Sequence, residues 1–171
     1  MAKKIILYSL GLVLLFLVEA VIRPITVFEV APMYVLCGIS AIGILEKEKF
    51  GAIFGLIFGL FCDFTGGALF GSLALTFMIT GLVAGLLTEV TLSKNFLSTL
   101  VITESSVIVF GGLKALFYTV LNEEDLLSVI LYILLPKILL TLPFSILIYF
   151  MMKLIQNISE PNRERKRKRQ W

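Results

Sequence analysis

Histidine is absent from this chain of 171 residues, which also has only two cysteines and one tryptophan. Without histidine, catalysis by a histidine base and most transition-metal sites are disfavoured. Both cysteines, Cys37 and Cys62, fall inside apolar stretches, where a thiol usually acts as a small hydrophobic side chain. The sequence also lacks a G-x-S-x-G motif, a phosphate-binding loop and acids paired at catalytic spacing. We therefore expect a protein that is not an enzyme and that carries no metal or other cofactor.

Charge is scarce as well. Charged residues make up 16% of the chain and hydrophobic residues 58%, and the mean hydropathy is +1.00. Soluble domains carry more charge and shorter apolar runs. Apolar stretches that approach the ~20 residues needed to cross a ~30 Å hydrocarbon core recur along the whole sequence. The composition predicts an all-α polytopic membrane protein, with one helical domain over 1–155 and a basic cytoplasmic tail over 156–171.

Short polar segments divide the apolar sequence into six expected transmembrane helices. Their approximate ranges are 5–22, 32–45, 50–64, 69–90, 96–121 and 126–152. Pro32 is expected to open the second helix, because the first turn of a helix does not need a backbone N–H. Six spans place both termini on one side, and most lysines and arginines fall on that side. The positive-inside rule then predicts that both termini are cytoplasmic.

Glycines recur at regular spacing in the third and fourth expected helices. In the third helix they lie four residues apart, and the G-L-x-x-G-L-x-x-acid pattern that ends at Asp63 is repeated in the fourth helix, ending at Glu89. Glycines spaced by four form a stripe without side chains, which lets two membrane helices pack closely. We predict that the two helices pack antiparallel through Gly51, Gly55, Gly59, Gly81 and Gly85. The alternative is a chance echo, because glycine and leucine are common in membrane helices.

The segment 64–71 between these two helices is rich in glycine and favours a tight turn. Asp63 precedes this turn. We expect its carboxylate to accept hydrogen bonds from the backbone N–H groups of residues 65–67 or to reach Arg23, and so to shape the turn and cap the next helix. The alternative is a contact surface for a partner or ligand on the outer face, formed by Arg23, Asp63, Gly67 and Gly71.

Charged residues inside the expected spans require partners. Glu19 and Arg23 are four residues apart and are expected to pair. Glu104 lies ~12 Å from the cytoplasmic end of the fifth helix and Lys137 ~17 Å from the outer end of the sixth. These depths nearly coincide in a ~30 Å core, so we predict a buried ion pair of Glu104 and Lys137. Alternatively, a kink at Pro136 frees backbone carbonyls that bind the Lys137 ammonium.

The C-terminal tail is strongly basic. Its six positive residues are Arg163, Arg165, Lys166, Arg167, Lys168 and Arg169. A cluster of this kind is attracted to anionic lipid by ~1 kcal/mol per residue near the surface. We expect the tail to bind the cytoplasmic face of the membrane; an acidic protein partner and a purely topological role are the alternatives.

Taken together, these motifs resemble MreD, the rod shape-determining membrane protein family. The resemblance is sharp over roughly 32–85, although Met33 stands where the family often has an acid. The matching residues are Pro32, Gly51, Gly55, Gly59, Leu60, Asp63, Gly67, Leu69 and Gly71. The resemblance implies six helices folded like the substrate-binding subunits of energy-coupling-factor vitamin transporters.

The resemblance also implies a function. It places the chain in the inner membrane of a bacterium, as a non-enzymatic component of the rod complex that supports lateral peptidoglycan synthesis. The implied partners are MreC and, through the complex, MreB, RodA and its transpeptidase partner, with no nucleic acid. The alternative function is the substrate-binding membrane subunit of a vitamin-type transporter. Such subunits usually carry an A-x-x-x-A-type motif in their first helix, where this chain has only Ala20.

Overall fold

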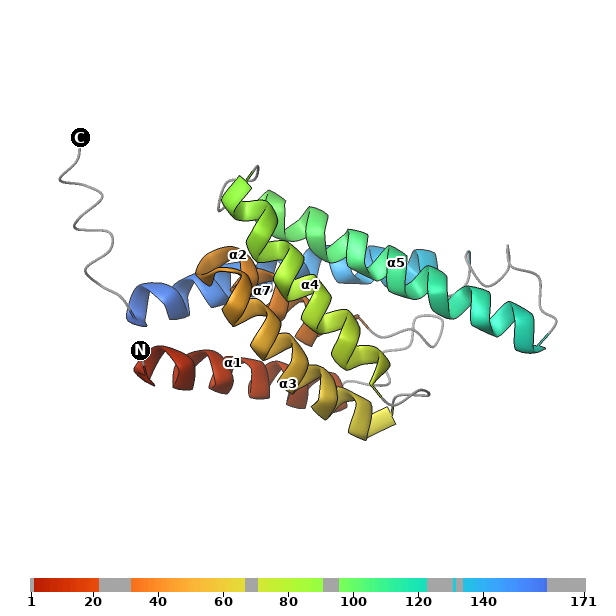
Figure 1. The fold of residues 1–171 in the computed structure, drawn as a ribbon, viewed down its shortest axis with the longest axis horizontal. Coiled ribbons are helices and arrows are strands. Elements are labelled where there is room, and N and C mark those ends of the chain that lie inside the picture. The colour runs from red at the N-terminus through yellow and green to blue at the C-terminus, as the bar shows by residue number, and fades with distance from the viewer. Residues whose placement is uncertain are drawn as a thin grey trace.

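The computed structural model describes residues 2–21, 32–66, 71–90, 96–122, 131 and 134–159. Within these residues the chain is all α-helical and contains no strand. The helices are α1 (Ala2–Val21), α2 (Tyr34–Glu46), α3 (Glu48–Gly66), α4 (Ser72–Val90), α5 (Phe96–Asn122) and α7 (Leu135–Ser159). Figure 1 shows a bundle in which each helix runs opposite to the one before it. The prediction of an all-α fold is confirmed for this part of the chain.

The short helix α2 lies at the centre of the bundle. Its sequence, YVLCGISAIGILE, is apolar on all sides, and such a helix is stable only when it is surrounded. All 13 of its residues are buried, and it packs against each of the other five helices. Ile39 and Ile42 are fully buried in the core cluster that α2 forms with α1 and α7.

The surrounding helices expose apolar faces. Large hydrophobic side chains such as Leu10, Leu147 and Val109 are more than half exposed on α1, α7 and α5. An exposed apolar surface of this extent marks contact with lipid or with another protein. Two helices of the described chain, Lys3–Val21 and Leu135–Ser159, are long and apolar enough to cross a membrane. The structure thus gives limited support to membrane association.

A single residue connects α2 to α3. Lys47 has φ 106°, a backbone conformation that residues other than glycine rarely adopt. Its N–H donates to Gly43 O at 3.1 Å, and its carbonyl accepts from Gly51 N–H at 3.2 Å, so both helices continue to the link. The expected charged turn at 46–49 is therefore reduced to Lys47 alone, because Glu46 belongs to α2 and residues 48 and 49 belong to α3.

The last helix extends farther toward the C-terminus than the sequence predicts. It ends at Ser159 instead of residue 152, two residues before Pro161. Proline disfavours helical backbone at the preceding residue, so the break belongs there. Residues 156–159, assigned to the tail, thus continue the helix. At the other end, Pro136 lies in the first turn of α7, where no N–H is required, while Pro143 lies inside the helix.

Candidate functional site

The glycines of α3 and α4 lie where these two helices touch. A Cβ added to Gly51, Gly55, Gly59, Gly81 or Gly85 falls within contact distance of backbone atoms of the other helix. A Cβ added to Gly51, for example, also lies 2.8 Å from the Cα of Gly43 on α2. Close backbone approach of this kind provides dispersion contacts that lipid cannot replace. The spacing of the glycines therefore corresponds to an antiparallel contact between the backbones of α3 and α4.

Asp63 continues this contact and caps α4. Its Oδ2 accepts hydrogen bonds from the backbone N–H groups of Gly71 and Ala74, both at 3.0 Å, and its Oδ1 accepts one from Leu73 at 3.1 Å. The first N–H groups of a helix have no partner within it, and the positive end of the helix dipole favours a carboxylate. Asp63 thus holds α4 against α3 through its first turn.

The structure corrects part of the prediction for Asp63. The expected donors were the N–H groups of 65–67, but α3 continues to Gly66, so the N–H groups of 65 and 66 belong to its own helical ladder. Asp63 is only 4% exposed, which makes it a structural cap and not an exposed contact for a partner. Gly71 has φ 91°, as suits glycine. Arg23 and Gly67 lie outside the described residues.

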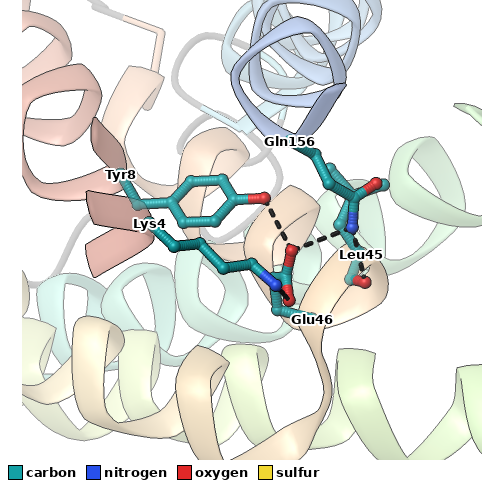
Figure 2. A network of polar contacts seen from close by, with 5 residues as sticks. All are labelled: Lys4, Tyr8, Leu45, Glu46 and Gln156. Carbon is teal, nitrogen blue, oxygen red and sulfur yellow. Dashed lines mark hydrogen bonds and ion pairs between the residues drawn. The ribbon is translucent and has the colours of Figure 1, made fainter. Parts of the chain in front are cut away.

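A buried polar network joins the start of α1 to the ends of α2 and α7 (Figure 2). The Glu46 carboxylate forms an ion pair with Lys4 through Oε2. Its Oε1 accepts hydrogen bonds from Tyr8 Oη and Gln156 Nε2, both at 2.9 Å. Gln156 Nε2 also donates to the Leu45 carbonyl at 3.0 Å. Both carboxylate oxygens of Glu46 are therefore satisfied although the residue is only 6% exposed.

The sequence did not indicate this network. Lys4 and Glu46 look like solvated residues at helix ends, and Gln156, the most distant partner of Glu46, is 110 residues away in the chain. The network shows that the described chain begins and ends at the same end of the bundle, since Lys4 and Gln156 both contact Glu46. Figure 1 shows the start of α1 and the end of α7 close together at one side.

At the opposite end of α2, a carboxylate from another helix provides the cap. Met33 at the N-terminal boundary has no side-chain acceptor, and Glu19 of α1 accepts the Val35 N–H through Oε2 at 3.0 Å. The sequence predicts an ion pair of Glu19 with Arg23, but Arg23 lies outside the described residues. The capping role of Glu19 was missed because it depends on how α1 packs against α2.

The predicted ion pair of Glu104 and Lys137 is not formed. Neither carboxylate oxygen of Glu104 has a hydrogen-bond partner among the described residues, although the side chain is buried. Two contacts give the antiparallel register of α5 and α7. The ring of Phe96 stacks on that of Phe150, and Gly111 lies against the side chain of Leu134.

This register explains the difference. It places Glu104 level with Thr141 along the helix axis, and Lys137 lies four residues, or ~6 Å, farther along that axis. The sequence prediction placed the two residues at one depth because it counted Lys137 from an outer end at residue 126 and Glu104 from a cytoplasmic end at residue 96, within a ~30 Å core. Helix α5 runs for 27 residues, about 40 Å, so depths counted from opposite ends of the two helices do not match that core.

A groove of about 370 Å³ opens between α4 and α5. Its lining is mostly apolar, with four hydroxyl side chains: Thr76, Thr80, Ser105 and Ser106. Three of them donate to a carbonyl of their own helix, four residues earlier: Thr76 to Ser72, Thr80 to Thr76 and Ser106 to Ile102. The groove thus offers a smooth apolar surface with few free polar groups.

Within the described residues, no group of three or more His, Cys, Asp or Glu side chains is placed to hold a metal ion, and both cysteines are buried free thiols. The basic tail residues from Arg163 to Arg169 lie outside the described chain. Comparisons with protein-family models, with curated proteins and with solved structures find no match. Any function must therefore be argued from the residues of this chain.

Proposed function

We propose that this chain is a non-enzymatic component of the bacterial rod complex, similar to MreD. It crosses the inner membrane six times with both termini in the cytoplasm, binds MreC and thereby supports lateral peptidoglycan synthesis. In this proposal MreB, RodA and its transpeptidase partner are reached through the complex, and a fold like that of energy-coupling-factor substrate-binding subunits is expected. The basic tail holds to anionic lipid.

One observation carries the proposal. The residues on which the resemblance to MreD rests include those that build the α3–α4 hairpin. Gly51, Gly55 and Gly59 allow the close approach, Asp63 caps α4, and Gly71 supplies the positive φ before that helix. A motif whose members combine into one structural unit is a stronger basis for family resemblance than the same residues scattered through a fold.

The arrangement of charge supports the proposed orientation. Lys4, Glu46 and Gln156 meet at one end of the bundle, where the chain begins and α7 ends. Lys47, Lys49 and Lys153 also belong to that end, because they lie at the α2–α3 link and in the last turns of α7. An excess of lysine and arginine at one end is typical of the cytoplasmic side.

Depletion of the protein in its own bacterium tests the proposal. We expect rod-shaped cells to become round, and MreC to co-purify with the tagged chain from detergent extracts. Re-expression of the wild type or of Gly112→Ala should restore the rods. The double variant Gly55→Leu/Gly59→Leu should not, because leucine at these positions forces α3 and α4 apart. Cells that remain elongated on depletion would refute the proposal, and a vitamin requirement with normal shape would point to the transporter alternative.

A further inference from the structure

Glu104 is a buried carboxyl group at the centre of the bundle. Its side chain is 8% exposed, and neither of its carboxylate oxygens has a hydrogen-bond partner among the described residues. The adjacent residue, Thr103, forms a 2.6 Å hydroxyl contact with Ser40 at the middle of the fully buried helix α2. Glu104 therefore lies at mid-height of the bundle, far from both of its polar ends.

The other buried acids of the described chain show what an ionised carboxylate requires here. Asp63 accepts three backbone N–H groups, and Glu46 has an ion pair and two further donors. Even Glu19, which is only partly buried, accepts the Val35 N–H. An ionised carboxylate that is buried without such donors costs many kcal/mol, and a group in that position binds a proton instead. Glu104 lacks these donors, which favours its neutral form.

The groups around Glu104 do not supply a compensating charge. From α2 the nearest titratable group is the buried thiol of Cys37. From α7 it is Lys137, about one turn away and not hydrogen-bonded to Glu104. The described side chains of α4, residues 72–88, include no titratable group, and neither do the other described side chains of α5.

We propose that Glu104 is an intramembrane proton-binding site. In the folded protein its carboxyl is neutral. Loss of this proton leaves an unpaired charge between α5 and α7 and drives the two helices apart, so protonation is coupled to their packing. The proposal is independent of the role in the rod complex.

Infrared difference spectroscopy of the full chain in lipid bilayers tests this directly. A protonated carboxylic acid has a C=O stretching band that is well separated from the bands of a carboxylate. We expect the wild type at neutral pH to show this band, and Glu104→Gln to lack it. The matched control is Asp63→Asn, which removes a carboxylate held by three N–H donors and should leave the acid band unchanged.

The measurement is made in sodium buffer and again with choline replacing sodium, because a bound sodium ion would keep the carboxylate ionised. An acid band in both buffers supports the proposal. Its absence in both, or its absence in sodium alone, overturns it. If Glu104→Gln fails to accumulate, wild-type protein labelled with carboxyl-13C glutamate gives the same answer: a shift of the acid band at neutral pH supports the proposal, and no shift overturns it.

Discussion

The sharpest test of the α3–α4 contact is whether a glycine-to-alanine substitution raises or lowers the stability of the protein. On an open helix surface alanine stabilises relative to glycine by about 0.5–1 kcal/mol, because glycine loses more backbone freedom on folding. Gly112 of α5 provides such a site, since no atom of the described residues lies within 4 Å of an added Cβ. Gly112→Ala should therefore raise stability slightly.

Gly55→Ala should do the opposite. An added Cβ there would overlap the carbonyl oxygen of Phe77, and it lies 2.6 Å from the Phe77 carbonyl carbon and 2.8 Å from the nitrogen of Met78. Ordinary van der Waals contact begins near 3.4 Å, so α3 and α4 must separate by about 1 Å. These neighbours are backbone atoms and cannot rotate away. Overpacking of this kind costs about 1–3 kcal/mol, more than alanine gains in helix propensity.

The two buried cysteines provide the assay. Cys37 and Cys62 are free thiols that a fluorogenic maleimide reaches only when the bundle opens. Heating purified protein in detergent with this dye gives an unfolding temperature. At roughly 2–4 °C per kcal/mol for a chain of this size, Gly55→Ala should melt several degrees below the wild type. A Gly55→Ala protein that melts at or above the temperature of Gly112→Ala would refute the backbone contact.

Three further predictions use the same assay. Lys4→Met leaves the buried Glu46 carboxylate without its cation and should cost about 3–5 kcal/mol, whereas Lys4→Met/Glu46→Gln should recover much of this loss; equal losses would show that the charge pair is not what matters. Asp63→Asn replaces one acceptor oxygen by an NH2 donor, which leaves at least one N–H of α4 without an acceptor, and should cost about 1–3 kcal/mol, with Asp63→Ala costing more. Gly71→Ala should cost about 1–2 kcal/mol through its positive φ alone, since no described atom lies within 4 Å of the added Cβ, and Gly71→Asn should cost less; an equal loss for Asn and Ala would contradict this reason.

Hydropathy and spacing along the chain predicted most of the helical elements. The expected ranges 32–45 and 96–121 differ by no more than two residues from Tyr34–Glu46 and Phe96–Asn122. The glycine stripe was recognisable because its period matches the helical repeat, a local property of the chain. A capping role for Asp63 was predicted because an acid before a glycine-rich turn has few other partners, although its donors were misplaced.

The sequence by itself determined that this chain is helical, apolar on most of its outer surface and divided by short polar turns, because these depend on neighbours within a few residues. Only the tertiary structure decided which distant polar groups meet. Glu46 obtains three partners from α1 and α7, and Glu104 lies level with Thr141 and is not paired with Lys137. The physical reason is register: contacts such as Phe96 with Phe150 set how far one helix slides along another. A shift of one turn, ~5.4 Å, exchanges every buried partner while leaving the hydropathy of each helix unchanged.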